Sequence, residues 1–263
     1  MRTAAGARVV RHGDRRGRDR LRRVLRSGGE LLVTAGLVLL LLVAHQLWWT
    51  DREARRGAER TVAALEREWE SGTAAGPGAP PGGSGTAAAP EPAAAPGASR
   101  APRRSDTPAA PPRRSRAYAV LAVPRLHLRV PVAEGVSAAD VLNKGYVGHY
   151  RGTQQPGRAG NFALAGHRNT HGEPFRYLPR LRRGDAIEVA TRSATYTYHV
   201  DQVLPRTSAL DSGVLRPVPR SLVRPGYGYD EPGFYLTLTT CTPEFTSRYR
   251  LVVWGKLVSV RPR

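Results

Sequence analysis

The chain contains a single cysteine, Cys241, among its 263 residues. One thiol cannot form an internal disulfide, and it cannot supply a structural zinc site built from several thiolates. Lysine is almost as scarce, because Lys144 and Lys256 are the only two in the sequence. The net charge of +20 therefore comes almost entirely from arginine. With so much alanine, glycine and proline, this composition is typical of a GC-rich genome.

The positive charge does not by itself indicate a nucleic-acid-binding protein. The sequence has neither zinc-finger cysteine spacing nor the aromatic-rich strands of RNA-binding modules. We therefore expect no nucleic-acid partner. An anionic membrane or wall polymer is the partner that such a charge favours.

The N-terminal region has the pattern of a membrane anchor. Residues 1–30 carry ten arginines and predict a basic cytoplasmic tail. The apolar run 31–49 would span about 28 Å as a helix, close to the ~30 Å core of a bilayer. It ends in Trp48 and Trp49, which suit the membrane interface, and the arginine-rich flank predicts a single-pass protein with its C-terminal part outside the cell. A cleaved signal peptide is the alternative, but no small-x-small site follows the apolar run before Asp51.

Three further segments follow the predicted anchor. Residues 50–70 contain no proline and one glycine, which favours a juxtamembrane helix. Residues 71–116 are rich in proline, alanine and glycine and predict a disordered linker, because they cannot bury enough apolar surface to fold. Residues 117–263 are the part of the chain able to form a core of ordinary size. We expect the folded domain there.

The folded part is predicted to be mainly β, a closed and mostly antiparallel β-barrel with short helices. Turn residues separate a series of strand-like runs, and few windows have helical periodicity. Residues 137–143 are expected to form one short helix with Ser137 as its N-cap. The predicted strands are 119–123, 126–132, 161–165, 186–190, 195–203, 235–240 and 251–260.

Cys241 ends one of these strands, as expected for an exposed nucleophile rather than a buried apolar residue. Histidine is the usual acid or base beside a thiol. His167 follows a strand through a glycine and opens a polar loop, with His171 as its nearest competitor. The two could also suggest a metal pair, but flanking glycines disfavour a helix, so we expect neither a metal nor a cofactor. Either Arg248 or Arg250 could stabilise an oxyanion.

These segments together resemble the sortase family. Residues 237–241 read T-L-T-T-C and are followed by R-L-V-V from Arg250, which is similar to the sortase signature. Residues 161–168, N-F-A-L-A-G-H-R, resemble the sortase histidine segment. The run G-H-Y-R-G-T from Gly148 and the later P-G-x-x-G-N-F from Pro156 are similar to the class E sortases of actinobacteria.

The resemblance implies a role for each matching position. Cys241 would be the nucleophile, His167 the acid and base, and Arg250, rather than Arg248, the oxyanion-binding group. Thr240, His171 and Tyr150 would contribute to substrate binding. Many class E members have an aromatic residue at the position of His171, so this departure leaves the substrate preference open.

The implied activity is that of a membrane-anchored cysteine transpeptidase. It would cleave a C-terminal L-A-x-T-G or L-P-x-T-G sorting signal of an exported protein through a thioacyl intermediate. An amine of a peptidoglycan precursor would then accept the acyl group. Two alternatives remain at this point. One is a wall enzyme like the L,D-transpeptidases, although their Ser-His-Gly-Cys context is absent. The other is a non-catalytic tethered wall-binding module with a buried Cys241.

Overall fold

The computed structural model describes residues 13–74 and 115–263. The chain divides into two compact units, residues 1–50 and 51–263, to both of which helix α1 (Gly13–Ala74) contributes. Residues 1–12 of the predicted tail and residues 75–114 of the predicted linker lie outside the described residues. The boundaries proposed from the sequence for tail, anchor and linker therefore stay predictions.

In the first unit, α1 carries the apolar run 31–49. In the described part of the chain, one helical stretch, within Gly28–Ser71, is long and apolar enough to cross a membrane. The leucine and valine side chains between Leu31 and Val43 are exposed rather than packed in a core. Helix α1 continues through the predicted juxtamembrane segment without a break, because that segment has no proline to end it.

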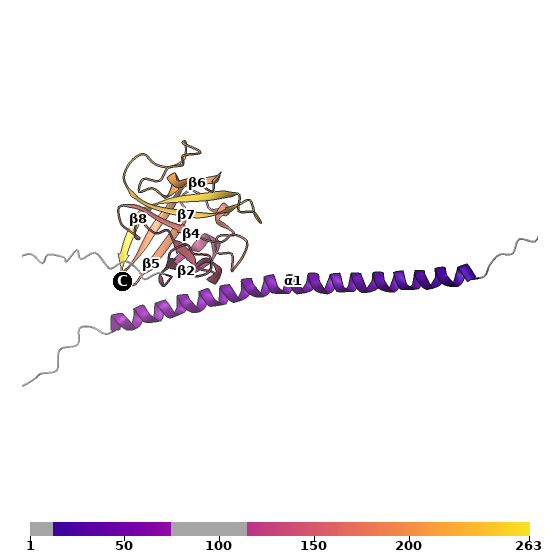
Figure 1. Ribbon diagram of the computed structural model, residues 1–263. Helices are drawn as coiled ribbons and strands as arrows, with labels where there is room; N and C mark the ends of the chain where they lie inside the picture. The colour runs from indigo at the N-terminus through magenta and orange to yellow at the C-terminus, as the bar shows by residue number, and fades with distance from the viewer. Residues whose placement is uncertain (1–12, 75–114) are drawn as a thin grey trace, which may run out of the picture. The chain divides into compact units, whose positions relative to one another are not determined.

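The second unit is built on a closed eight-stranded barrel, which confirms the predicted fold class (Figure 1). Neighbouring strands follow the order β1-β2-β3-β4-β7-β8-β6-β5 around the barrel. The strands are β1 (Ala117–Val123), β2 (Leu128–Glu134), β3 (Val147–His149), β4 (Gly160–Ala165), β5 (Ala186–Thr191), β6 (Ala194–Ser208), β7 (Phe234–Thr242) and β8 (Tyr249–Pro262).

Helices in the barrel unit other than α1 are short 3₁₀ turns. They are η1 (Pro124–Leu126), η2 (Leu142–Lys144), η3 (Leu178–Arg180) and η4 (Ser212–Leu215). The helix predicted at 137–143 forms only in part. The Ser137 hydroxyl accepts a hydrogen bond from the Asp140 N–H (3.4 Å), as a cap does, but Leu142 N–H bonds five residues back to the Ser137 carbonyl (3.1 Å). The turn is too wide to continue as an α-helix, and η2 follows it.

Side chains fill the barrel interior because alternate residues of each strand point inward. The interior cluster takes Phe162 and Leu164 from β4, Leu236 and Leu238 from β7, and Leu251 and Val253 from β8. The residues between them point to the outer face of the barrel. This alternation decides which side chains near the strand ends are available to a ligand.

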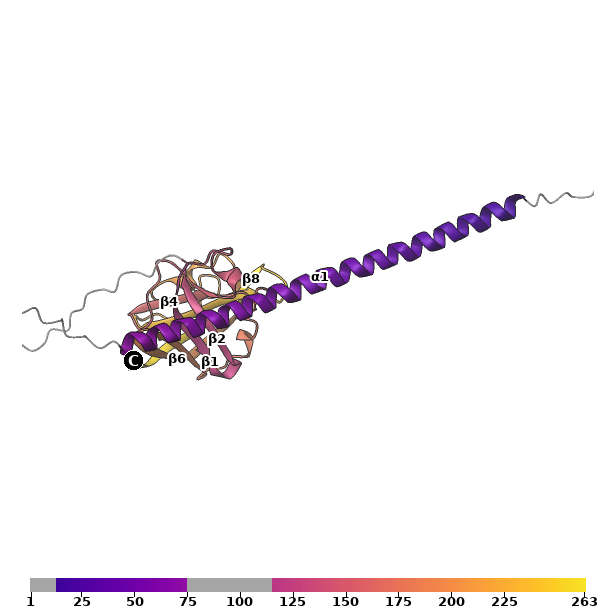
Figure 2. The same ribbon diagram turned by 90° about the horizontal axis from the view of Figure 1, so that it is seen from below.

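The last part of α1 covers the outer face of β1 and β2 (Figure 2). Val62, Leu65 and Trp69 recur at helical spacing and are each less than a tenth exposed. They pack against the outward-facing Val120 of β1 and Ala133 of β2. The apolar stripe of this helix therefore packs against the outer face of the barrel.

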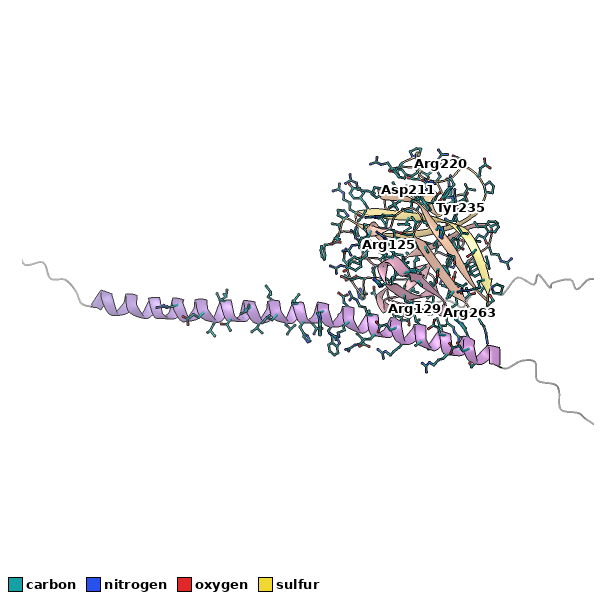
Figure 3. The ribbon with its side chains drawn as sticks, turned by 180° about the vertical axis from the view of Figure 1, so that it is seen from behind. Arg125, Arg129, Asp211, Arg220, Tyr235 and Arg263 are labelled. Carbon is teal, nitrogen blue, oxygen red and sulfur yellow. The ribbon has the colours of Figure 1, made fainter. Side chains whose placement is uncertain are left out.

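Two contacts fix this helix along the barrel. Arg129 of β2 forms an ion pair with Glu66, and the Arg263 guanidinium lies over the Trp69 ring at 4.9 Å. Figure 3 shows Arg129 and Arg263 on the side of the barrel that faces α1, whereas Asp211 lies at the far end. Residues 51–74 of α1 therefore do not cover the outer face near Asp211.

The segment between β6 and β7, residues 209–233, covers a second part of the outer face. A separate apolar cluster forms beneath it from Val214 and Tyr229 of this segment and Trp254 of β8. The Tyr229 and Tyr235 rings stack with their centroids 4.1 Å apart. We call residues 209–233 the β6/β7 segment.

Candidate active site

Cys241 lies near the end of β7 and is partly exposed. Its Cα partner across the antiparallel pair β7–β8 is Arg250. Leu238 and Leu251 point into the barrel, so Cys241 and Arg250, which stand an odd number of residues from them, point to the outer face. The thiol and the guanidinium therefore occupy the same side of the sheet.

Arg248, the competitor of Arg250, is placed differently. It precedes β8, is exposed, and its guanidinium lies 5.3 Å from the centroid of the Tyr249 ring. Arg250 donates hydrogen bonds from Nη1 to the carbonyl oxygens of Ser247 (2.8 Å) and Tyr249 (3.1 Å). Arg250 is thus held by the turn that follows Cys241, while Arg248 points along the surface.

His167 reaches the same edge because β4 and β7 run parallel. The last paired residues are Ala165 and Thr239. One residue further, the Thr240 hydroxyl donates to the Gly166 carbonyl oxygen (2.8 Å), which continues the register. The next residues in that register are His167 and Cys241. The sequence indicated a mostly antiparallel sheet and gave no sign of this parallel pair.

The His167 imidazole is half-buried among polar and aromatic groups. Its Nε2 lies 2.9 Å from Asn143 Oδ1, an acceptor, so Nε2 carries the proton and donates. The His171 ring stacks on it with 5.3 Å between centroids. Burial, and secondarily the charge of His171, lowers the pKa of His167 below its usual value. The imidazole therefore stays neutral to a lower pH than a free histidine does.

Thr240 and Tyr150, two of the predicted substrate-binding residues, have different surroundings. Thr240 is buried, and its hydroxyl is engaged by the Gly166 carbonyl. The Tyr150 hydroxyl shares a hydrogen bond (3.1 Å) with the hydroxyl of Thr239, which stands on the outer face like Cys241. Tyr150 and Thr239 both line a cavity of about 290 Å³.

This cavity opens beside Arg250 on the outer face of β7 and β8. The β6/β7 segment closes its other side with apolar side chains from Leu210, Val214 and Leu215. Leu210 is 90% exposed, so its side chain is available to a ligand in this cavity. One end of the cavity is therefore apolar, and the other carries the hydroxyl groups and the guanidinium.

Asp211 holds the β6/β7 segment in shape from a buried position. Burial opposes its ionisation, but hydrogen bonds from Ser221, from Thr207 and from the Leu222 N–H outweigh that effect and keep the pKa of Asp211 below its usual value. The carboxylate thus joins Thr207, at the end of β6, to Ser221 and Leu222 of the β6/β7 segment.

The loop that carries His171 is attached to α1. Arg55 donates from Nε to the Gly172 carbonyl oxygen (3.1 Å) and from Nη2 to Glu173 (2.8 Å), and the Gly172 N–H lies 3.3 Å from Asp51 Oδ1. His171 itself has a positive φ of 53°, so its backbone needs such support. The sequence did not reveal that a juxtamembrane helix would touch the loop after His167.

Sequence reasoning did not single out Asn143, Arg168 or Thr239. Thr239 could have been found, because it stands two residues before Cys241 and so shares its face of the strand. Arg168 directly follows His167, but one arginine among so many carried no signal. Asn143 meets His167 only through the fold. Among residues 13–74 and 115–263, no group of three metal-ligating side chains gathers.

Comparisons with known proteins identify the family of this domain. Residues 121–258 match the model of the sortase domain. The chain is 40% identical over 243 residues to sortase SrtE1 of Streptomyces coelicolor, covering 90% of this chain and 58% of that protein. It is 35% identical over 238 residues to sortase SrtE2 of the same organism, covering 88% and 80%. The chain thus spans a little over half the length of the first of these relatives.

Two solved structures share the barrel. A crystal structure of sortase E1 from Streptomyces coelicolor with a tripeptide in its active site is 51% identical, with a TM-score of 0.54, and the match covers 57% of this chain and 92% of that one. Sortase E from Streptomyces avermitilis is 40% identical, with a TM-score of 0.50 and the same coverage. From the matched domain and these relatives, the chain belongs to the sortase family and is a class E sortase.

Proposed function

We propose that this protein is a membrane-anchored cysteine transpeptidase that joins exported proteins to the cell wall. The observation that carries the proposal is the placement of Cys241, Arg250 and His167 on one edge of the barrel, beside a cavity of about 290 Å³. Family membership supports the reaction class. The apolar end of the cavity suits the leucine of an L-A-x-T-G or L-P-x-T-G sorting signal.

The first half-reaction transfers an acyl group to the thiol. The Cys241 sulfur, as thiolate, attacks the carbonyl carbon of the Thr–Gly bond, and Arg250 donates hydrogen bonds to the oxygen on which negative charge develops. The C–N bond then breaks. His167, as imidazolium, gives its proton to the departing amine, which leaves a thioester on Cys241 and a neutral imidazole.

The second half-reaction regenerates the Cys241 thiolate and the His167 imidazolium. An amine of a peptidoglycan precursor attacks the thioester carbonyl, and the neutral His167 takes the proton that this amine loses. The C–S bond breaks, and the new amide leaves with the sorted protein. His167 serves as acid in one step and base in the other, so both steps use the same ring.

The proposed topology follows from the charge around the apolar run. Arginine-rich residues 1–30 remain in the cytoplasm, α1 crosses the membrane once, and the barrel works outside the cell. This is the side on which exported proteins and wall precursors are found. Protease added to intact cells should degrade the barrel and spare an epitope tag at residue 1.

A transfer assay on the full chain in detergent micelles tests the reaction. The protein is incubated with L-A-x-T-G and L-P-x-T-G peptides plus glycine or diaminopimelate, and mass spectrometry follows both the Cys241 adduct and the exchanged product. We expect both species with the wild type and neither with Cys241→Ala. Exchange that persists in Cys241→Ala would refute the nucleophile. Wall binding without any adduct would favour the non-catalytic module.

A further inference from the structure

Arg168 links the strand end that bears His167 to the strand end that bears Cys241. Its Nη1 donates to the Thr242 hydroxyl (2.9 Å) and to the Cys241 carbonyl oxygen (3.3 Å). Its Nη2 lies 3.5 Å from a carboxylate oxygen of Glu244. The three acceptors belong to Cys241 itself, to Thr242 and to Glu244.

The surroundings of Arg168 give it little net contribution to the stability of the fold. The side chain is 10% exposed, and its one acidic neighbour, Glu244, is 45% exposed and so partly screened by water. The Nε–H is buried with no hydrogen-bond partner. A buried guanidinium that is paired mainly with neutral oxygens recovers little of its desolvation cost. Local arrangements that cost stability concentrate at functional sites.

Two hydrogen-bonded cross-links bracket the candidate catalytic pair. On one side of it, Thr240 donates to the Gly166 carbonyl oxygen (2.8 Å). On the other side, Arg168 donates to Thr242 (2.9 Å). The flanking residues are thus joined in the order 166 to 240 and 168 to 242. Each neighbour of His167 is thus hydrogen-bonded to one neighbour of Cys241.

We propose that Arg168 is a positioning residue that fixes the His167 imidazole relative to the Cys241 sulfur. The inference rests on the proposed function, because it takes these two side chains as acid/base and nucleophile. Beyond β4, the Gly166 N–H donates to the Thr239 carbonyl oxygen (3.2 Å) and Thr240 donates to the Gly166 carbonyl oxygen, so both of these contacts join the two strands on the side that precedes His167. The Arg168 guanidinium adds a contact on the side that follows His167. Because the guanidinium is planar and its N–H directions are fixed, this contact also fixes the orientation of the loop.

The position of the fork predicts which kinetic constant it controls. Arg168 is absent from the residues that line the 290 Å³ cavity, so it has no part in holding the peptide there. A misplaced acid/base of the order of 1 Å lowers turnover by roughly 10²-fold. Loss of Arg168 should therefore lower kcat and leave KM nearly unchanged, and both half-reactions should slow together because His167 acts in each.

Arg168→Lys in the full chain, in detergent micelles, is the main test. Lysine keeps the charge and loses the fork, so we expect kcat to fall roughly 10²-fold, with KM within about two-fold of the wild type. Arg182→Lys, at an exposed arginine away from the site, is the matched control and should behave as the wild type. A wild-type kcat for Arg168→Lys, or a raised KM with unchanged kcat, would overturn the proposal.

Thr242→Val provides a second route that leaves the buried charge in place. It removes the 2.9 Å contact, and we expect kcat to fall by about ten-fold, the usual effect of losing one charge-assisted hydrogen bond. The double variant with Arg168→Lys should lose less than the product of the two single losses, since both act through one contact. Fully multiplicative losses would show that the contact does not matter. Thermal unfolding identifies a variant that fails to fold, in which case Thr242→Val alone decides.

The wild-type protein distinguishes a failure of the proposed function from a failure of the proposed role of Arg168. If no thioacyl adduct forms on Cys241 in the wild type, the proposed function fails and Arg168 has no pair to position. If the adduct forms normally in both the wild type and Arg168→Lys, with equal kcat, the proposed function stands and the role of Arg168 is rejected.

Discussion

Cys241 and Arg250 are Cα partners across β7 and β8, and both point to the outer face of the barrel. The pairing brings a charged fork to the side of the sheet on which the thiol is exposed. Arg248, two residues earlier, lies over the Tyr249 ring instead. Two arginines that are nearly equivalent in the sequence therefore have separate surroundings, and substitutions can tell them apart.

Arg250→Lys should be strongly impaired, because a lysine cannot reproduce two parallel N–H donors. We expect kcat/KM in the peptide-exchange assay to fall by roughly 10²–10³-fold, the usual cost of removing an oxyanion donor. Arg248→Lys should remain within about two-fold of the wild type, as exposed surface changes usually do. Equal effects of the two substitutions would argue against Arg250 as the oxyanion-binding group.

His167→Ala should lower kcat by roughly 10²–10⁴-fold, the usual contribution of a general acid or base. His171→Ala should mainly alter the preference between L-A-x-T-G and L-P-x-T-G peptides, because this ring stacks beside the acid/base. Steady-state kinetics with both peptides checks the pair. The reverse pattern, with His171 essential and His167 dispensable, would exchange their roles.

The pKa of His167 should rise in His171→Gln. Burial lowers the pKa first and the charge of His171 lowers it further, and the substitution removes only the second cause. The imidazole should therefore take up its proton at a higher pH than in the wild type, as followed by the ring C–H resonances of His167 in NMR. In the wild type a depressed pKa also means that stability falls as the pH drops below that of a free histidine, ~6.5. An unchanged midpoint would show that His171 has no electrostatic effect.

Asp211→Asn should loosen the β6/β7 segment. The amide keeps one acceptor oxygen, whereas the carboxylate accepts from Thr207, Ser221 and the Leu222 N–H. We expect a loss of about 1–3 kcal/mol in the free energy of unfolding at pH 7 and a raised KM with little change in kcat. Urea unfolding and exchange kinetics measure the two effects.

The pH dependence of this variant follows from the lowered pKa of Asp211. The stabilisation is present above the pKa of an unfolded aspartate, ~3.9, and is lost as the pH falls through the lower folded value. The wild type and Asp211→Asn should therefore converge in strongly acidic solution. Glu231→Gln makes the same change of charge at an exposed site and should have no effect. A constant difference at every pH would contradict the role of the charge.

Leu65→Ala should release the helix from the barrel without unfolding the barrel. Leu65 is 8% exposed and packs on the outer face of β1 and β2, so truncation should cost about 2–5 kcal/mol of docking. Hydrogen exchange should speed up in residues 51–70 and in the loop at Gly172, which Arg55 holds. Arg67→Ala, on the exposed face of the same helix, is the control. Unchanged protection would mean that the helix docks weakly.

Much of the fold could be predicted because alternation is a local property. The seven predicted strands all exist, with ends shifted by a few residues. Strand β3 was missed because three residues are too few to show a period. The turn at 137–143 begins with a helical bond from the Val141 N–H to the Ser137 carbonyl oxygen, but the Leu142 and Asn143 N–H groups bond to carbonyl oxygens five residues back. Alternating residues look the same in parallel and antiparallel pairs, so the sequence could not reveal that β4 and β7 run parallel.

The candidate site, like the fold, could be predicted from the sequence only in part. Cys241, Arg250 and His167 could be singled out because each stands at the end of a strand-like run within a family motif. Their neighbours could not. Asn143 contacts His167, and Arg168 contacts Cys241, only through pairings between segments far apart in sequence. The contact of Arg55 with the loop after His171 spans 117 residues and has no local pattern.

The parallel pairing of β4 and β7 has a consequence for how this enzyme could change. The stretch between the two strands leaves β4 at Ala165, beside Thr239, and returns at Phe234, beside Gly160. Loops within it, such as the β6/β7 segment, can lengthen, shorten or be exchanged while the ladder keeps the ends of β4 and β7 side by side. The β6/β7 segment, which lines one side of the cavity, is thus a separate piece of chain from the paired strand ends beside which His167 and Cys241 lie. Transplanting the β6/β7 segment from a relative offers a direct way to retarget the enzyme while keeping its reaction machinery.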